Sequence, residues 1–357
     1  METLASLLHT TPAIAWMGAK VVVVFFGLLT IAALFTWVER RGSAMIQDRI
    51  GPNRAPILGR FRILGLGQLL ADGIKFFFKE DLVPTDATRG LFWLAPFLAF
   101  VPAMIGFAVI PFGRSFESGG QTIHLAVLDP ANGMGMLYPL AIGSVAVYGV
   151  LVAAWSSNNK WSILGGMRSS AAMVSYEIGM SLAVVAVFMA TGGYDPSEII
   201  SVQGGTFWKV IPNWYVFHQP LGFLVFFTCM FAETNRLPFD FAEGESEIVA
   251  GFNTEYGSMK FSLLALAEYS HMITASALVA TLYFGGWQVP FMAHPPVLLT
   301  VASFLLKMVF FAWVFVWIRW TLPRFRYDQL MHLGWKVMLP LSMVNLLFHA
   351  WRMSQGH

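Results

Sequence analysis

The sequence predicts an all-α, polytopic membrane protein with eight transmembrane helices and one amphipathic helix on the cytoplasmic side. Of its 357 residues, 57% are hydrophobic and only 12% are charged, and the mean hydropathy is +0.63. A soluble domain of this composition would expose too much apolar surface to water. Neither a polar linker nor a repeat divides the chain, so we expect residues 1–357 to form a single integral membrane domain.

Eight apolar stretches are long enough to cross the hydrocarbon core of a bilayer as helices. They lie near residues 14–38, 91–113, 135–155, 170–190, 213–232, 261–284, 297–318 and 335–352. The first has no basic n-region and no cleavage site, so we interpret it as a retained span and not as a signal peptide. Lys and Arg concentrate in the connections after the first, third, fifth and seventh stretches, which predicts cytoplasmic connections there and periplasmic termini.

The first of these connections contains FRILGLGQLLADGIKFFFKED, residues 61–81, which has the pattern of a helix lying on a membrane surface. Its apolar face comprises Leu66, Leu70, Ile74 and Phe77, and its polar face comprises Gln68, Asp72, Lys75 and Lys79. Such a helix is either a simple anchor or part of a site. Ahead of it, Glu39 and Arg40 lie where the first span ends, and an arginine there is usually only an orientation signal.

Ionisable residues within the spans are more informative, because an acid at the centre of a transmembrane helix costs roughly 2.5–3.5 kcal/mol on insertion scales. The candidates are Glu177, Glu233, Glu268, His271 three residues after Glu268, and Lys307. Taken singly, each has a structural alternative, such as a hydrogen-bonded pair in the bundle or a lysine that snorkels to the interface. Buried acids on three consecutive spans favour a chain of proton-exchanging sites.

The stretch FAETNRLPFDFAEGESE, residues 231–247, gathers acids beside a single base, Arg236. The acids are Glu233, Asp240, Glu243, Glu245 and Glu247. Closely spaced carboxylates repel one another when ionised, so such a group shares protons and responds to a nearby change of charge. The competing interpretation is an ordinary solvated acidic face, against which the neighbouring Pro238, Phe239 and Phe241 argue.

No residue pattern in the chain predicts a metal site, a covalent catalytic group or a redox centre. The single cysteine, Cys229, lies among apolar residues and is interpreted as a small buried side chain. Without spaced Cys, His and Asp residues the chain cannot by itself hold zinc or an iron–sulfur cluster. It also has no glycine-rich phosphate loop.

Six motifs occur along the chain in an order that resembles the H subunit of bacterial NADH-quinone oxidoreductase, respiratory complex I, whose mitochondrial counterpart is NADH dehydrogenase subunit 1. The motifs are ERRGSAMIQDRIGPNR, LADGIKFFFKE, WSSNNKWSILGGMR, VSYE, FAETNRLPFDFAEGESEIVAGFNTEYGSMKF and LAEY. The resemblance covers nearly the whole chain. It implies an eight-helix component of a proton-translocating enzyme in the cell inner membrane, with no cofactor bound by this chain alone.

The resemblance also implies roles for individual residues. Glu39, Arg40, Asp72, Arg236, Asp240, Glu243, Glu245 and Glu247 would line a quinone chamber, and Glu177, Glu233, Glu255 and Glu268 would couple it to proton movement. We add His271 and Lys307 to the coupling group because they lie within spans. One departure is Ala172, which stands where the family usually has glutamine.

The resemblance implies that the substrate is a quinone, ubiquinone or menaquinone, and that FMN and the iron–sulfur clusters belong to partner subunits. The implied partners are the peripheral quinone-site and terminal iron–sulfur subunits, small membrane subunits and antiporter-like subunits, and no nucleic acid. Two alternatives stay open: a self-contained proton or ion transporter, and the membrane component of an energy-converting hydrogenase. The lack of an inverted repeat argues against the first, and the combined GPNR, AETNR and EYGSMKF motifs argue against the second.

Overall fold

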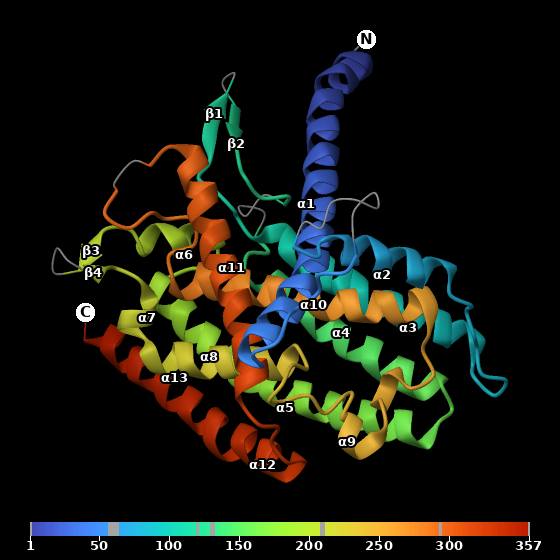
Figure 1. The fold of residues 1–357 in the computed structure, drawn as a ribbon. Helices are drawn as coiled ribbons and strands as arrows, with labels where there is room; N and C mark the ends of the chain where they lie inside the picture. Colours follow the sequence, from blue (N-terminus) through green and yellow to red (C-terminus); the bar gives the residue numbers. More distant parts are fainter. Residues whose placement is uncertain are drawn as a thin grey trace.

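The computed structural model is almost entirely helical, which confirms the predicted all-α membrane architecture (Figure 1). It describes residues 2–55, 64–118, 121–128, 133–207, 211–292 and 295–355, and the side chains of residues 2–16, 117, 118, 121–123, 207, 245 and 246 are outside that description. Two short antiparallel hairpins accompany the helices. They are β1 (Phe116–Ser118) with β2 (Gln121–Ile123), and β3 (Thr206–Phe207) with β4 (Ile211–Pro212).

Within the described ranges, seven helical segments are long and apolar enough to cross a membrane. They are α1 (Glu2–Ile46, of which Met17–Ile46 qualifies), α3 (Arg89–Ile105) with η1 (Gly106–Val109), α4 (Leu137–Ser156), α5 (Lys160–Thr191), α10 (Ser258–Tyr283), α11 (Val297–Thr321), and the continuous run of α12 (Tyr327–His332), η4 (Leu333–Met338) and α13 (Leu339–Ser354). The span expected at 213–232 consists of the shorter α7 (Tyr215–His218) and α8 (Pro220–Glu233).

The connections between helices gather at two ends of the bundle, as eight alternating crossings require. One end, here the acid-loop end, holds residues 47–55 and 64–88 with α2 (Gly67–Phe78), and residues 234–257 with α9 (Glu245–Ile248) and η3 (Gly251–Asn253). The other, the hairpin end, holds both β-hairpins, α6 (Pro196–Val202) and the α10–α11 linker. In Figure 1 the β1–β2 hairpin lies beside the N-terminal part of α1, and α9 and α12 lie at the opposite side of the molecule.

Polar contacts tie the connections together at each end. At the acid-loop end, Lys260 Nζ lies 3.0 Å from Asp81 Oδ1, and the Asn159 amide donates to Glu255 Oε1 at 2.7 Å. At the hairpin end, Lys20 Nζ donates to the His124 carbonyl at 2.8 Å. These contacts join segments that the sequence predicts on the same side of the membrane.

The helix α8 is short for a membrane crossing. Its 14 residues span about 21 Å at 1.5 Å per residue, whereas the hydrocarbon core is about 30 Å thick. Arg236, three residues past the end of α8, lies 3.7 Å from Glu268 in the interior of α10, so the chain leaves the helix at Glu233 while still within the depth of the bundle. Non-helical backbone at that depth is tolerated only where protein covers it or where it lines a cavity.

Aromatic and small side chains fill the core between the helices. Phe231 of α8 stacks on Phe315 of α11 with ring centroids 4.0 Å apart. A Cβ atom on Gly149 of α4 would lie 2.5 Å from the Ala99 nitrogen of α3, so only glycine permits this approach of two helices.

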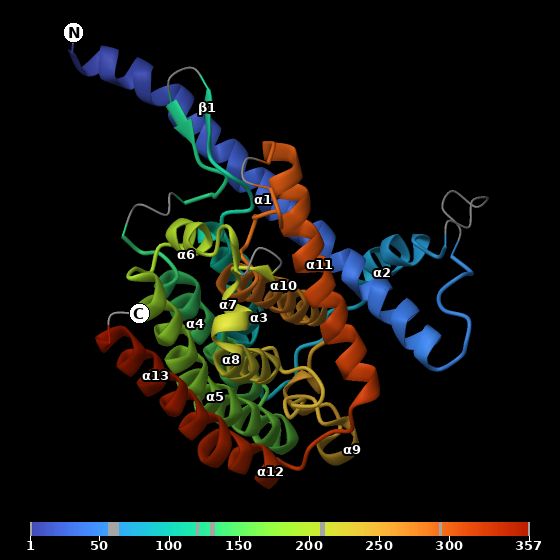
Figure 2. The same cartoon turned by 90° about the vertical axis from the view of Figure 1, so that its left-hand side faces the viewer.

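Figure 2 shows α1 running past the bundle beside α10 and α11, with α2 alongside its C-terminal part.

The alternating topology predicts two groups of exposed positions that label from opposite sides of a sealed vesicle. We expect cysteines at 47, 158 and 328 to react from one side and cysteines at 115 and 206 from the other, since all five side chains are exposed. The natural Cys229 is buried and serves as an unreactive background. Labelling in detergent confirms that each new thiol is reactive, and mixed sidedness within either group would contradict the topology.

Candidate functional site

A buried carboxylate, Glu39 near the C-terminal end of α1, joins three other structural elements. Its Oε2 accepts hydrogen bonds from Arg236 Nη1 at 3.2 Å and from the Tyr269 hydroxyl at 2.7 Å. Its Oε1 accepts a hydrogen bond from Arg319 of α11. Glu39 is only 5% exposed, so its charge is compensated by protein cations and not by water.

The main partner, Arg236, follows α8 and is itself 4% exposed. Its Nη2 lies 3.7 Å from Glu268 Oε2, and its guanidinium lies 4.3 Å from the centre of the Tyr269 ring. Asn235, two residues past the end of α8, has a positive φ of 50°, which asparagine adopts more readily than most residues. Arg236 thus links the α1 carboxylate to the α10 carboxylate, and the sequence predicts all three residues as site members.

Aromatic anchors hold the acidic loop against the bundle. Phe239 and Phe241 are 4% and 1% exposed, and Phe239 stacks on Phe325 with centroids 5.6 Å apart. Gly251 closes the loop with φ of +55°, and a Cβ there would lie 1.7 Å from the Ala242 carbonyl oxygen. Only glycine fits this position.

Two acids of this loop form a second layer beside the Glu39 network. Asp240 accepts from Arg324 Nη2 at 2.8 Å, and its other oxygen accepts from the Glu243 backbone N–H at 3.3 Å. Asn253 donates to Glu243 Oε1 at 2.7 Å. Burial raises the pKa of Glu243, and the Asp240 carboxylate raises it further against the opposing charges of Arg236 and Arg319.

The two layers together contain more acids than bases among the described residues. The four carboxyls are Glu39, Asp240, Glu243 and Glu268, and the three guanidinium groups are those of Arg236, Arg319 and Arg324. With four negative and three positive charges, one carboxyl has no cation of its own when all are ionised. Sharing a proton among the carboxyls relieves that excess.

The amphipathic helix α2 is attached to the site near its middle and at its C-terminal end. Near its middle, Asp72 Oδ2 lies 2.5 Å from Arg40 Nη1. Past its C-terminus, the Ser258 hydroxyl lies within hydrogen-bond distance of the carbonyls of Phe76 and Lys79, at 3.0 and 2.9 Å. Its outward residues Leu70, Ile74 and Phe77 stay exposed, as the predicted apolar face requires.

Two further predicted acids lie on either side of α4. Ser144 donates to Glu177 of α5. A Cβ on the adjacent Gly143 would lie 2.8 Å from Glu233 Oε1, so that carboxyl packs directly on the α4 backbone. The Oε2 atom of Glu233 is buried and meets no hydrogen-bonding partner among the described residues.

The remaining predicted residues lie apart from this network. Glu247 is exposed, and its Oε2 lies 2.7 Å from Arg168 Nη1, as expected of a solvated acid. Glu255 accepts a hydrogen bond from the Asn159 amide at the start of α5. Lys307 donates to the carbonyls of Phe284, Gly286 and Gln288 near the hairpin end. Ala172 is buried at 2% exposure, and the side chain of Glu245 lies outside the described residues.

Three residues of the site are not predicted by the sequence: Tyr269, Arg319 and Arg324. The two arginines have the pattern of orientation signals in the connection after the seventh span, and Tyr269 does not stand out beside Glu268. Arg319 lies 280 residues from Glu39 in the chain, so no local spacing could join them. The sequence indicates these arginines only indirectly: the excess of acids in residues 231–247 needs cations from elsewhere in the chain.

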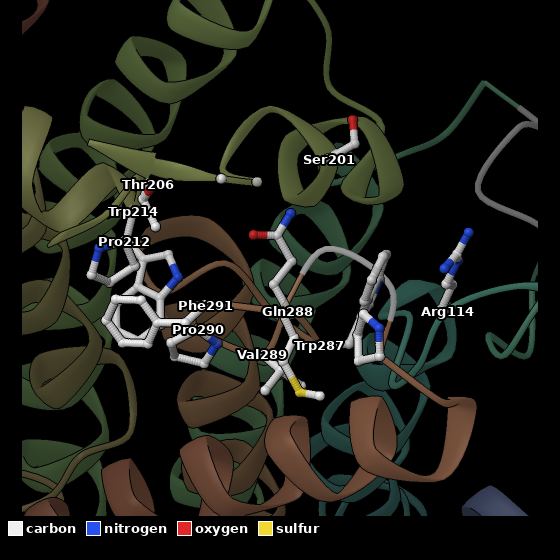
Figure 3. Close-up of a pocket in the computed structure, with 14 residues that line it drawn as sticks. Arg114, Ser201, Thr206, Pro212, Trp214, Trp287, Gln288, Val289, Pro290 and Phe291 are labelled. Atoms are coloured by element: carbon white, nitrogen blue, oxygen red, sulfur yellow. The ribbon is translucent and has the colours of Figure 1, made fainter. Parts of the chain in front are cut away.

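A pocket of about 560 Å³ lies at the hairpin end and offers different chemistry. In Figure 3 the Gln288 side chain lies between Trp214 and Trp287, and Arg114 lies at the far side. Among the described residues that line this pocket, Arg114 is the sole ionisable one. The described carboxyls that the sequence predicts for proton exchange do not line this pocket. Nowhere in the described ranges do three His, Cys, Asp or Glu side chains group as metal ligands.

Comparisons with known proteins agree on one family. The model of the NADH dehydrogenase family matches residues 19–350. The chain is 47% identical over 350 residues to the NADH-quinone oxidoreductase H subunit of Leptospira biflexa, with 94% of each chain covered. It is 46% identical over 341 residues to an H subunit of Geobacter sulfurreducens, covering 93% of each, and 45% identical over 333 residues to one of Cytophaga hutchinsonii, covering 92% and 93%.

Neighbouring residues of α1 give a matched test of the network. Glu39→Gln leaves Arg236 and Arg319 short of a buried counter-charge, so we expect a loss of about 3–5 kcal/mol of stability. Arg40→Gln breaks a pair whose side chains are 49% and 22% exposed, so we expect roughly 0–1 kcal/mol. Thermal unfolding of the purified protein in detergent compares the two. Equal midpoints for both variants would contradict the structural role given to Glu39.

Proposed function

The chain belongs to the family of NADH-quinone oxidoreductase H subunits, and we propose that it forms the quinone chamber of that enzyme and couples quinone reduction to proton translocation. The observation that carries the proposal is the Glu39–Arg236–Glu268 network. It connects a loop at one end of the bundle to a carboxyl inside a membrane-spanning helix. A change of charge at the loop therefore changes the electrostatic environment of that carboxyl within the membrane.

The chamber lies between α1, α2 and the acidic loop. The ordered pair of Arg40 and Asp72 joins the first two elements, and the exposed apolar face of α2 offers a surface for an isoprenoid tail. A quinone headgroup needs two electrons and two protons to become a quinol. Asp240 and Glu243, with their shared surplus of negative charge, are the proton source that we infer on this chain.

The coupling path runs from the network toward the interior of the membrane. Reduction of the quinone adds negative charge beside the acidic loop, and that charge favours proton uptake by carboxyls around Arg236. Glu268 exchanges its pairing with Arg236 when its own protonation changes. Glu233 and Glu177, held on adjacent residues of α4, then continue the path toward partner subunits.

Electrons reach the quinone from outside this chain. The single cysteine is buried within α8 and cannot supply the thiolates of an iron–sulfur cluster, so those clusters and the FMN belong to partner subunits. The peripheral partners cover the acid-loop end, which faces the cytoplasm, and antiporter-like and small membrane subunits contact the spans. The protein works in the cell inner membrane on ubiquinone or menaquinone.

Purification separates this function from that of a self-contained transporter. We expect the native chain to copurify with flavin and iron–sulfur subunits, because it holds no redox centre of its own. A chain that purifies alone and moves protons without quinone would contradict the proposal.

Arg40 and Asp72 test the quinone chamber. Arg40→Gln or Asp72→Asn disturbs the chamber wall, so we expect quinone reduction to fall several-fold while reduction of an artificial acceptor that takes electrons upstream stays the same. The two activities are measured on the same membranes. The exposed pair Arg326 and Asp328 gives the matched control, Asp328→Asn, which should affect neither activity. Equal losses in both assays would indicate an assembly defect instead.

Glu233 tests the coupling path. Glu233→Gln keeps the size of the side chain and removes its titration, and no second acid adjoins it on α8, so we expect assembly with a severalfold loss of quinone turnover and proton uptake into vesicles. Glu247→Gln is the comparison, because that exposed acid is paired at the surface and should matter less. Normal turnover and full pumping in an assembled Glu233→Gln enzyme would show that this carboxyl has no coupling role.

A further inference from the structure

The pocket at the hairpin end combines an apolar wall with a cation. Its volume of about 560 Å³ falls in the usual range of small-molecule pockets, about 300–1,000 Å³. In Figure 3, Pro212, Trp214 and Phe291 lie together on one side of Gln288, and Arg114 lies on the other. The pocket therefore offers an apolar surface and a positively charged rim to the same ligand.

This pocket lies where membrane spans end. The helix α10 ends at Tyr283 and α11 begins at Val297, and the linker between them supplies residues 287–292 of the lining. Tryptophan side chains, of which the pocket has two, are enriched at the boundary between membrane and water. On the same linker, Phe291 is 69% exposed and Met292 is 52% exposed. Exposed apolar side chains that adjoin an apolar pocket are typical of a binding surface.

Three hydrogen bonds from Lys307 hold this linker in place. The ammonium group donates to the carbonyls of Phe284, Gly286 and Gln288 at 2.8, 2.9 and 2.8 Å. The Gln288 amide donates in turn to the Ile200 carbonyl of α6. The chain therefore forms the wall of the pocket before any ligand binds, which lowers the cost of ordering on binding.

The charges around the pocket favour an anionic ligand. Arg114 is exposed, and its guanidinium makes no ion pair with an acid in the described ranges. The Lys307 ammonium does not line the pocket, but it lies 4.7 Å from the centre of the Trp214 ring, so a second positive charge adjoins the apolar wall. Among the described residues, no Asp or Glu side chain lines the pocket.

We propose that this pocket binds an anionic phospholipid from the leaflet at the hairpin end. The phosphate accepts hydrogen bonds from the Arg114 guanidinium, whose planar fork matches phosphate oxygens, and an acyl chain lies over Trp214 and Phe291. A free phosphate ion would leave the aromatic wall uncovered, and a neutral apolar molecule would leave Arg114 without a counter-charge. A phospholipid satisfies both features of the pocket.

The experiment uses the whole enzyme in phosphatidylcholine vesicles and two photoactivatable lipids. Phosphatidylglycerol and phosphatidylcholine, each with the reactive group on one acyl chain, are compared, and mass spectrometry maps the labelled residues. We expect phosphatidylglycerol to label residues 287–292 at least about threefold more strongly, because the choline cation offsets the attraction of a phosphate to Arg114. Excess inorganic phosphate should not displace the lipid, since it cannot cover the apolar wall.

Variants of Arg114 test the contact with the headgroup. In Arg114→Gln we expect labelling by phosphatidylglycerol to fall to the level of phosphatidylcholine, whereas Arg114→Lys keeps the charge and should retain most of the labelling. Arg352→Gln is the matched control, because Arg352 is exposed and does not line the pocket. NADH-driven quinone reduction in the same vesicles verifies that each variant enzyme is assembled.

Four outcomes would overturn the lipid site. Equal labelling by the two lipids in the parent, or parental labelling in Arg114→Gln, would remove the recognition of the headgroup. Loss of labelling in excess inorganic phosphate would assign the pocket to a free anion, and a map of the whole enzyme with a partner segment in the pocket would assign it to protein. None of these outcomes bears on the proposed function, because no residue of the quinone chamber or the coupling path is changed.

Discussion

The burial of Glu39 is the constraint on which the site depends. A carboxylate that is 5% exposed needs cations and hydrogen bonds at fixed positions, and here they come from the acidic loop, α10 and α11. Because isolated buried charges cost several kcal/mol, these elements cannot separate without large loss. The network therefore fixes where the loop after α8 lies, and with it the positions of Asp240 and Glu243. A stabilising interaction and a candidate functional site are here the same set of side chains.

The short α8 creates the space in which this network forms. A helix of full membrane length would carry residues 234–242 beyond the bundle, and Arg236 could not reach between Glu39 and Glu268. The exit of the chain at that depth is stabilised by buried Phe239 and Phe241 and by Gly251, which fits under the Ala242 carbonyl. These residues carry no titratable group themselves, yet they help to fix where Asp240 and Glu243 lie.

Hydropathy and charge placement predict the spans, their alternation and the amphipathic helix, because each depends on local composition and on transfer free energy. They also identify Glu39, Arg236 and Glu268 as notable. They cannot show that these three meet, since tertiary packing brings together residues far apart in the chain. Lys307 illustrates the same limit. Its mid-span position suggests proton coupling, but the folded chain directs its ammonium group to three carbonyls at the end of α10, away from the acids.

The balance of charge explains why this site suits proton movement better than a fully paired cluster would. If every carboxyl had its own guanidinium, protonation of any one would leave a buried cation uncompensated, and the barrier to proton entry would be high. With one carboxyl in excess, the cluster gains stability when it holds a proton, and the raised pKa of Glu243 follows from that excess and from burial. In the coupling that we propose, this proton moves among the carboxyls as the guanidinium groups change partners, and negative charge beside the loop thereby alters protonation inside the membrane.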